Sequence, residues 1–267
     1  MMPKLYRASP TRTNQRCTCL ARRRRITHTG RHDYPFIMEN TDFAAGSSLH
    51  ILILAAGAST RLGQPKQLVR LDGRPLLHTM VSHAVAVAGH AVTVVVGAHA
   101  QELAMLLKHS PASVIVNRQW QEGIGASIRC GISALPPACD AVLIMLADQV
   151  GVSSDDLKRL VSAWKGQDSS IVGSLYAGTV GVPAIFPRWC FSDLAALRGD
   201  IGAKRVLQRH SDRLIRVPMP NAATDLDTPE QLEELRRVRQ PRASGEIRLP
   251  RIGTDGIQDS DGFSLNS

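Results

Sequence analysis

The sequence predicts an α/β protein built around a doubly wound, mostly parallel sheet. Short aliphatic runs alternate with segments of helical periodicity through the middle of the chain, and this alternation is typical of parallel sheets covered by helices on both faces. The 267 residues, of which 43% are hydrophobic, suffice for one domain with a large core but are too few for two full domains of this kind. We therefore expect a single Rossmann-like three-layer α/β/α sandwich with a small β-hairpin insertion.

The first elements follow from their apolar patterns. Residues 50–54 (HILIL) form a short aliphatic run, as in strands buried on both faces of a sheet. Apolar residues recur at helical spacing over 74–88, and the valine-rich run 92–96 is the next expected strand. The run 140–146 (DAVLIML) is the clearest buried strand, and it ends just before Asp148.

Weaker patterns predict the remaining elements. They are a helix over 102–108, a strand over 113–116, a helix over 155–165, strands over 171–176 and 182–186 joined by a turn at Ala177-Gly178, a helix over 202–209, a strand over 214–217 and a helix over 228–238. Pro229 suits the first turn of the last helix, because proline lacks the N–H that would be unpaired there.

The two ends of the chain differ from its middle in composition. Residues 1–37 contain nine Lys or Arg and one acidic residue, so they hold most of the net charge of +9. Beyond residue 239 the chain is rich in Pro, Ser, Gly and Asp and lacks periodicity. These shifts predict a basic disordered leader over 1–48, a folded domain over 49–238 and a flexible tail over 239–267. Because the charge lies in the leader, we expect no nucleic-acid binding by the folded domain.

The leader leaves several interpretations open. Its Arg-rich, Thr-rich composition fits an organelle transit peptide or a basic arm for nucleic acid. Initiation at Met38 is at least as plausible, and the leader would then be no part of the mature protein. No apolar run is long enough for a secretory core or a membrane span. The five cysteines are an odd number without a C-x-x-C motif, which favours the reducing cytoplasm.

The segment 54–66, LAAGASTRLGQPK, is the most informative in the chain. Its small residues let the backbone approach a ligand closely, and Gly57 and Gly63 can adopt positive φ angles. Arg61 and Lys66 lie four and nine residues beyond Gly57, so a curled loop can bring a guanidinium and an ammonium onto one triphosphate. The loop therefore predicts a polyphosphate-binding site.

Spacing excludes two better known phosphate loops. A Walker loop has four residues between its glycines and then Lys-Ser/Thr, whereas five residues separate Gly57 from Gly63 and Lys66 follows Gln64-Pro65. A dinucleotide fingerprint needs three glycines at fixed spacing, and this loop has two.

The loop resembles LAAG-x-S/x-x-R-x-G-x-x-K, the signature of nucleotidyltransferases that move a nucleoside monophosphate from a triphosphate onto a phosphorylated acceptor. Five later segments resemble the molybdenum cofactor cytidylyltransferases, in matching order over about residues 50–237. They are NRQWQEGIGASIRCG (117–131), LADQ (146–149), GVPAIF (181–186), GDIGAK (199–204) and DLDTPE (225–230). The resemblance implies that residues 49–238 are a nucleotidyltransferase domain that moves CMP from CTP onto the phosphate of molybdopterin or molybdenum cofactor, with Mg²⁺, releasing pyrophosphate.

The resemblance also implies residue roles. Arg61, Lys66 and Asp148 would be catalytic. The nucleotide-binding residues would be Leu54, Ala55, Ala56, Gly57, Arg61, Gly63, Lys66, Gly125 and Ser127. The turn Gly125-Ala126-Ser127 would lie over the nucleobase. For Arg129 two roles stay open, a phosphate contact or an exposed cation on a helix capped by Ser127.

Charge and resemblance together indicate a Mg²⁺ site at Asp148. Ligands of open α/β sheets bind at the carboxyl ends of strands, so Asp148 and Lys66 should face the same crevice. A carboxylate beside a triphosphate is unfavourable unless a divalent cation lies between them; the alternative is that Asp148 caps a helix. Asp225 and Asp227 point to alternating sides of an extended segment. We choose Asp225 as the second ligand, because the resemblance favours it and Asp227 can cap the last helix.

Four residues are expected to hold the acceptor, namely Gly181, Pro183, Asp200 and Gly202. Asp200 and Lys204 are equally well explained as ordinary charges at a helix start. The chain has Val150 and Val182 where the family usually has Pro and His. His78 and His83 lie on the first helix, and we expect no metal or catalytic role for them.

Two alternatives to this function stay open. One is a guanylyltransferase, or a cytidylyltransferase with another phosphorylated acceptor; the preference for CTP rests on Leu-Ala-Ala-Gly, where guanylyl enzymes tend to have Leu-Ala-Gly-Gly. The other is a non-catalytic nucleotide- or cofactor-binding protein, against which Lys66 and Asp148 speak. The expected partners are a nucleoside triphosphate, a molybdopterin-type acceptor and, transiently, molybdoenzymes or their chaperones, with no membrane contact.

Overall fold

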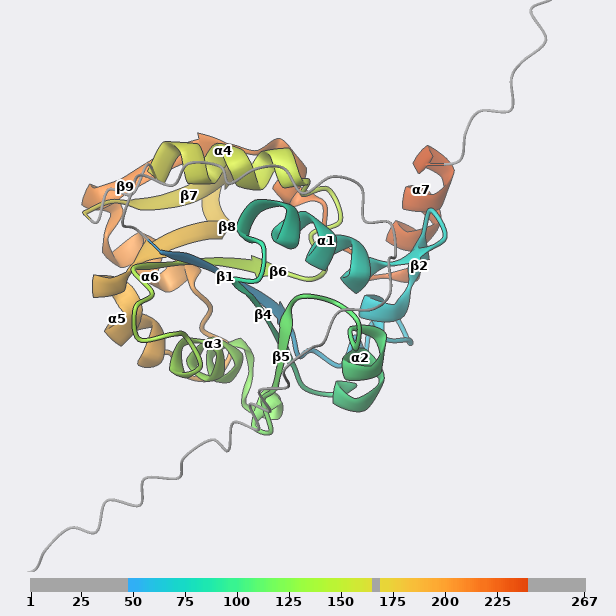
Figure 1. Cartoon of the computed structure of the whole chain (residues 1–267). Helices are drawn as coiled ribbons and strands as arrows, with labels where there is room; N and C mark the ends of the chain where they lie inside the picture. Colours follow the sequence, from blue (N-terminus) through green and yellow to red (C-terminus); the bar gives the residue numbers. More distant parts are fainter. Residues whose placement is uncertain (1–47, 165–168, 240–267) are drawn as a thin grey trace, which may run out of the picture.

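The computed structural model describes residues 48–164 and 169–239 (Figure 1). The strands are β1 (Leu49–Ala55), β2 (Arg70–Leu71), β3 (Arg74–Pro75), β4 (Val92–Val96), β5 (Ser113–Val116), β6 (Ala141–Leu146), β7 (Ile171–Tyr176), β8 (Thr179–Pro187) and β9 (Leu214–Pro218). The helices are α1 (Leu76–Ala88), α2 (Ala100–Leu106), α3 (Ile124–Ser133), α4 (Ser154–Trp164), α5 (Phe191–Ala195), α6 (Lys204–Arg209) and α7 (Pro229–Arg239).

Seven strands form one sheet in the order β5-β4-β1-β6-β8-β7-β9. Neighbouring strands from β5 to β6 are parallel, β8 is antiparallel to both β6 and β7, and β9 is parallel to β7. The prediction of a mostly parallel sheet between helical layers is confirmed. Because β1 and β6 are adjacent and parallel, the loops that follow them leave from the same edge of the sheet.

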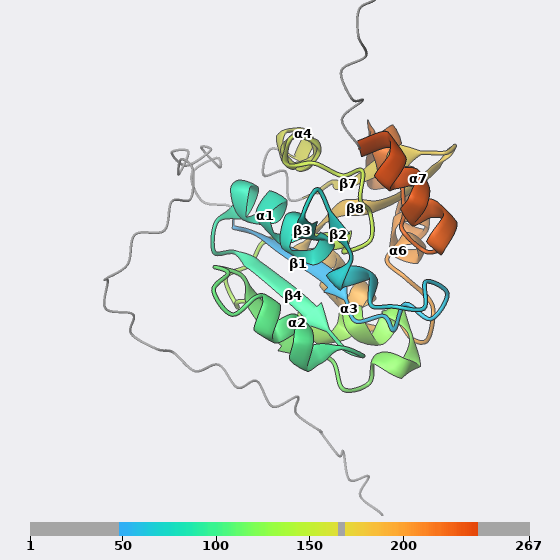
Figure 2. The ribbon, with the colours of Figure 1, turned by 90° about the vertical axis from the view of Figure 1, so that its right-hand side faces the viewer.

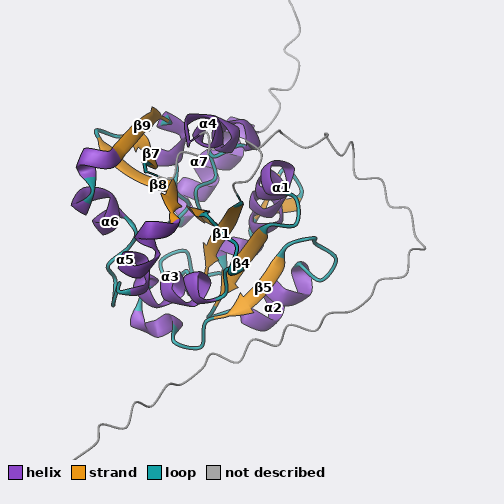
Figure 3. Cartoon of the chain, turned by 60° about the vertical axis from the view of Figure 1, so that its left-hand side comes forward, coloured by secondary structure: helices purple, strands orange, loops and turns teal. Residues whose placement is uncertain are grey.

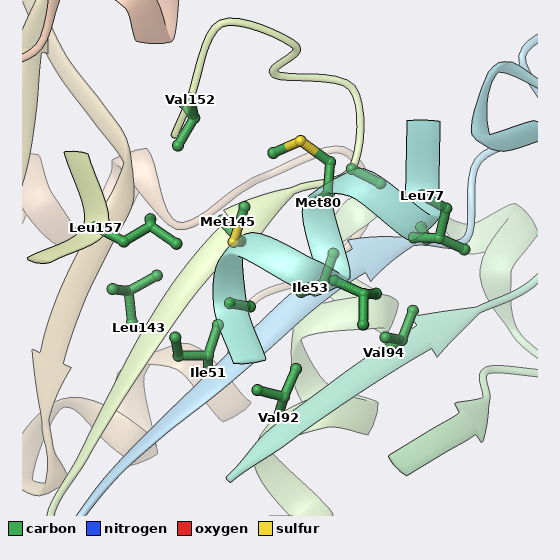
Figure 4. Close-up of a cluster of buried hydrophobic side chains, with 14 of the residues drawn as sticks. Ile51, Ile53, Leu77, Met80, Val92, Val94, Leu143, Met145, Val152 and Leu157 are labelled. Atoms are coloured by element: carbon green, nitrogen blue, oxygen red, sulfur yellow. The ribbon is translucent and has the colours of Figure 1, made fainter. Parts of the chain in front are cut away.

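Helices cover both faces of the sheet, as Figure 3 shows. Ile51 and Ile53 of β1 face the layer of α1 and α4, where they pack with residues such as Leu77 and Met80 (Figure 4). Leu52 faces the opposite core, which contains apolar side chains from α3, α5 and α6. This alternation makes β1 an uninterrupted apolar run, because both of its faces are buried.

The predicted hairpin is present, and it belongs to the main sheet. Ala177 and Gly178 form its turn with φ angles of 47° and 72°, as expected of a two-residue turn that needs positive φ at both positions. A second hairpin, β2–β3, forms a separate two-stranded sheet. The helix predicted to begin at Arg74 begins at Leu76, because Arg74 and Pro75 pair with β2.

Most of the predicted leader and tail lie outside the described residues, so the division into 1–48, 49–238 and 239–267 stays a prediction. Within the described residues, no helix has the length and apolar character needed to cross a bilayer. Cys139 and Cys190 are buried free thiols.

Candidate active site

A buried glutamine fixes the loop that follows β1. The side-chain amide of Gln67, 1% exposed, donates hydrogen bonds of 3.1 Å each to the carbonyl oxygens of Ala55 and Gly57. The Ser59 hydroxyl accepts a 3.1 Å hydrogen bond from the backbone N–H of Lys66. The two ends of the loop are thus tied together, which places Lys66 at its base. Sequence reasoning missed Gln67, although its signal was a polar residue directly before the apolar pair Leu68-Val69.

The backbone of the loop departs from prediction at one glycine. Gly63 has the expected positive φ, 72°, but Gly57 does not, and Ser59 has a φ of 56° instead. Gly57 is exposed, and a Cβ added there would meet no atom within 4 Å. The open space above Gly57 lets a ligand reach the backbone. Leu54, Ala55 and Ala56 end β1 or directly follow it, and all three are buried.

Three charged residues meet below the loop. The Lys66 ammonium donates hydrogen bonds to Asp148 Oδ2 and, over 2.9 Å, to Asp227 Oδ1. The Lys66 and Asp148 side chains are only 15% and 16% exposed. Arg61 is 78% exposed, and its guanidinium lies 3.7 Å from Asp227 Oδ2. Figure 2 shows the loop after β1 and the segment that leads into α7 on the same side of the molecule.

The close packing of these charges alters their pKa values. Burial opposes the charge on Lys66, but Asp148 and Asp227 outweigh burial and raise the pKa of the ammonium above its ordinary value. The hydrogen bond from Lys66 lowers the pKa of Asp227. Partial burial, with the nearby charges of Asp148 and Asp227, raises the pKa of Asp225 to about 6. Asp225 as a whole is an exposed residue.

The segments that carry Asp148 and Asp225 lie side by side. Gln149 and Asp225 form an isolated antiparallel bridge, and the N–H of Leu226 donates to the carbonyl oxygen of Asp148 over 3.1 Å. The prediction that Lys66 and Asp148 face each other is confirmed. The chosen second carboxylate, Asp225, lies beside Asp148, whereas Asp227 contacts both loop cations. The metal-binding role of either aspartate stays a prediction.

Asp148 carries an oxygen that no protein group satisfies. Its Oδ1 is buried and has no hydrogen-bond partner, and a buried carboxylate oxygen left unpaired is costly. Such an atom fits the inner ligand of a cation. Among the described residues, this site included, no three His, Cys, Asp or Glu side chains are arranged to hold a metal ion by themselves. Any ion would therefore complete its shell from substrate oxygens or water, which is common for Mg²⁺.

The predicted base-binding turn is helical. Gly125 and Ser127 belong to α3, whose N-cap is Gly123, so Ser127 is a buried residue of the helix and does not cap it. The Ser127 hydroxyl accepts a 3.1 Å hydrogen bond from the side-chain amide of Asn117. The N–H of Gly125 donates to the carbonyl oxygen of Gly199 over 2.9 Å. The nucleobase role of Gly125 and Ser127 stays a prediction.

Arg129 is held within the protein. Its guanidinium donates to the carbonyl oxygen of Leu197 and to Glu122 Oε2, each over 2.6 Å. Arg129 thus joins α3 to the segment after α5, and with its side chain 19% exposed it is not an exposed cation. Its phosphate contact stays a prediction. The hydrogen bond from Arg129 is also the chief cause that lowers the pKa of Glu122.

The four predicted acceptor residues lie in two places. Gly181 and Pro183 flank Val182, whose carbonyl oxygen accepts hydrogen bonds from Gln149 and Tyr176 over 2.8 and 3.1 Å. This pair therefore adjoins the Asp148 segment. Asp200 and Gly202 adjoin the start of α3, because Cβ atoms added at Gly123 and Gly202 would approach Asp200 and Ile124 respectively. Gln149 is 1% exposed, and its hydrogen bond to Val182 is a contact that sequence reasoning missed.

One of the two histidines of α1 makes a hydrogen bond to the neighbouring segment. His83 Nδ1 lies 3.0 Å from the carbonyl oxygen of Val152, where it connects α1 to the segment before α4. No metal-binding group that includes His78 or His83 occurs within the described residues.

Comparisons with known proteins identify the family of the chain. The model of the MobA-like NTP transferase domain matches residues 51–214. Nicotine blue oxidoreductase of Paenarthrobacter nicotinovorans is 32% identical over 193 residues, which are 69% of this chain and 94% of that protein. The purine catabolism protein PucB of Bacillus subtilis (strain 168) is 30% identical over 201 residues, which are 70% of this chain and 95% of that protein.

A solved structure shares the fold and contains a divalent metal. Rv0371c of Mycobacterium tuberculosis H37Rv, crystallised in complex with manganese, superposes with a TM-score of 0.56 at 25% identity over 72% of this chain and 99% of that one. The described sheet, the loop after β1 and the family match lead to one conclusion. The chain belongs to the MobA-like NTP transferase domain family and carries a nucleotidyltransferase domain of that type.

Proposed function

We propose that this protein transfers CMP from CTP to the phosphate of molybdopterin or molybdenum cofactor and releases pyrophosphate, in a Mg²⁺-dependent reaction. The observation that carries the proposal is the cluster of Lys66, Asp148 and Asp227 below the glycine loop. The site lies at the edge where the parallel strands end, which is where such sheets bind ligands. Its cations can bind phosphate oxygens, and its carboxylates can bind the metal ion that accompanies a polyphosphate. The match to the MobA-like domain supports the reaction type.

The residues that would hold the metal ion are Asp148 and Asp225. The unpaired, buried Oδ1 of Asp148 and the neighbouring carboxyl of Asp225 provide oxygen ligands of the kind that Mg²⁺ prefers. A bound Mg²⁺ would supply neutralising charge to the phosphate oxygens. The manganese complex of Rv0371c supports a divalent ion in a related fold.

The cations of the loop have a direct role in this proposal. Lys66 is nearly buried and fixed by two carboxylates, so its ammonium is preorganised to stabilise the charge that develops toward pyrophosphate. Arg61 is exposed at the outer side of the loop, where its guanidinium fork can bind a terminal phosphate. The open backbone at Gly57 leaves space for the phosphate chain between them.

The acceptor needs little help from the protein. A phosphate monoester is already anionic near neutral pH, so it can attack without a general base. The protein must then orient the acceptor in line with the bond that breaks. Gly181 and Pro183, beside the Asp148 segment, are proposed to hold it, and Asp200 and Gly202 to contribute from the start of α3. The choice of CTP and of molybdopterin rests on the motif resemblance.

Incubation with labelled CTP or GTP and a molybdopterin source tests the proposal, with and without Mg²⁺. The expected result is pyrophosphate release and a labelled pterin dinucleotide from CTP, in the presence of both acceptor and metal only. Preferential use of GTP would indicate a guanylyltransferase. If pyrophosphate is released only with another phosphorylated acceptor, the reaction type stands and only the proposed acceptor is wrong. Nucleotide binding without pyrophosphate release would indicate a non-catalytic protein.

A further inference from the structure

Asp227 contacts both cations of the glycine loop. Its Oδ1 accepts the 2.9 Å hydrogen bond from Lys66, and its Oδ2 lies 3.7 Å from the Arg61 guanidinium. The N–H groups of Asp227 and Thr228 donate to the side-chain oxygen of Gln231 over 2.7 and 3.0 Å. Gln231 therefore fixes the backbone that carries the carboxylate, and both carboxylate oxygens face cations.

The environment of Asp227 differs from that of a metal ligand. Asp148 has a buried oxygen without a partner, and Asp225 forms no ion pair among the described residues. Asp227 instead shares Lys66 with Asp148. An ammonium has three N–H donors, so these two carboxylates use two of them and direct the third away from both. With Asp148, Asp227 thus fixes the direction in which the Lys66 ammonium points.

The formal charges of the site add a second consequence. Arg61 and Lys66 are outnumbered by three carboxylates, those of Asp148, Asp225 and Asp227, so the ionised site has a formal charge of −1. A bare polyphosphate would meet net repulsion there, whereas a polyphosphate with a divalent cation would bring compensating charge. Neutralising Asp227 removes this excess and leaves the Asp148 and Asp225 pair intact.

We propose that Asp227 is a positioning residue, which aims Lys66 and Arg61 at the phosphates and whose negative charge makes the site discriminate against metal-free polyphosphate. The inference rests on the proposed function, because it assumes that the loop cations bind phosphate. It assigns the metal to Asp148 and Asp225, and it gives Asp227 a role in selecting the metal-bound form of the nucleotide.

Calorimetric titration with inorganic tripolyphosphate in EDTA tests the charge effect. Asp227→Asn should bind tripolyphosphate at least about fivefold more tightly than the wild type, a typical size for coupling between nearby sites. Glu233→Gln is the matched control, because it also removes one negative charge but from a side chain that pairs with Arg236 on α7. The affinity of this variant for tripolyphosphate should equal that of the wild type. Unchanged or weaker binding by Asp227→Asn would overturn the proposal.

Electron paramagnetic resonance with Mn²⁺ tests the assignment of the metal. Asp227→Asn should retain Mn²⁺ binding, whereas Asp225→Asn should lose most of it. Equal loss in both variants would make Asp227 a metal ligand and refute its proposed role. Thermal unfolding of each variant identifies any that fail to fold. Asp227→Glu keeps the charge, so its affinity for tripolyphosphate should resemble that of the wild type, in contrast to that of Asp227→Asn.

Steady-state kinetics completes the test. Asp227→Asn should lower kcat while KM for the nucleotide stays equal or falls, and Asp227→Glu should restore part of kcat. A raised KM with unchanged kcat would contradict an aiming role. Because tripolyphosphate binding needs neither a nucleobase nor an acceptor, a positive binding result without CTP turnover would remove the proposed function and leave the role of Asp227 standing.

Discussion

The side-chain amide of Gln67 donates a 3.1 Å hydrogen bond to the carbonyl oxygen of Gly57, ten residues earlier in the chain. A second hydrogen bond of the same length joins Gln67 to the carbonyl oxygen of Ala55, so one buried side chain satisfies two carbonyl groups where the chain leaves β1. Buried carbonyl groups need such partners. The loop is consequently fixed by its own sequence, before any ligand contributes.

Replacing this glutamine tests how the loop is held. Gln67→Leu keeps the side-chain size but removes the donor, and it should lower the free energy of unfolding by about 1–3 kcal/mol because the buried carbonyl oxygen of Ala55 and the partly buried one of Gly57 lose a partner. Urea denaturation gives this value, and kcat should fall with it because Lys66 is adjacent. Gln208→Leu, at an exposed position of α6, is the control. Equal stability of the two variants would show that the loop does not depend on Gln67.

The contact between Lys66 and Asp148 leads to the principal catalytic prediction. Lys66→Ala and Asp148→Ala should each lower kcat for nucleotidyl transfer at least about a hundredfold, the usual size of a lost transition-state contact. Lys158→Ala removes a lysine from an exposed pair with Asp155 on α4, and it should leave kcat unchanged. Wild-type kcat in both active-site variants would refute the catalytic assignment.

Sequence patterns predicted the elements that depend on burial of continuous apolar runs. The strands β1, β4 and β6 were found because their side chains are buried on both faces, and the meeting of Lys66 and Asp148 followed from the parallel order of β1 and β6. A rule about the sheet edge was enough for that contact, because it depends on topology and not on side-chain detail.

The missed features depend on tertiary contacts. The sequence predicts a helix that Ser127 caps, but α3 already begins at Ile124. Gly125 lowers helix propensity, and its N–H donates a hydrogen bond to the distant carbonyl oxygen of Gly199. The strands β2 and β3 have two residues each, too few for any periodicity. The hydrogen bonds from Gln67 and Gln149 join segments that are distant in sequence or lack regular secondary structure. No local sequence pattern predicts such contacts.

The packing of α3 on β1 supplies a further prediction. A Cβ at Gly131 would overlap the side chain of Leu52, which is fully buried between β1 and α3. Gly131→Ala should therefore lower the free energy of unfolding by about 1–3 kcal/mol, as overpacking does, although alanine favours helices. Gly202→Ala is the control for stability, because its Cβ would meet Ile124 at an ordinary 3.6 Å. Denaturation midpoints compare the two, and a more stable Gly131→Ala would contradict the close packing.

The start of α4 makes stability depend on pH. Asp156 accepts hydrogen bonds from the N–H and hydroxyl groups of Ser153 over 2.9 and 2.8 Å, and its own N–H donates to the Ser153 hydroxyl over 3.2 Å. Burial opposes ionisation of Asp156, but these hydrogen bonds and the Arg159 guanidinium outweigh burial and lower the pKa of the carboxyl. The folded protein therefore favours ionised Asp156 more than the unfolded chain does.

The sign of the pH effect follows from this lowered pKa. The stabilisation by Asp156 is fully present above the unfolded-state pKa, about 3.9, and it is lost as pH falls through the folded-state pKa. Above that range, the wild type should be more stable than Asp156→Asn by about 0.5–2 kcal/mol, the usual contribution of an N-terminal cap. Urea denaturation from pH 7 to pH 3 should show this difference shrinking toward the acid end. A stability difference that stays constant with pH would mean that the charge of Asp156 does not contribute. Ser153→Ala removes one donor to the same carboxylate. In a protein that carries Ser153→Ala, adding Asp156→Asn should therefore cost less stability than it does in the wild type.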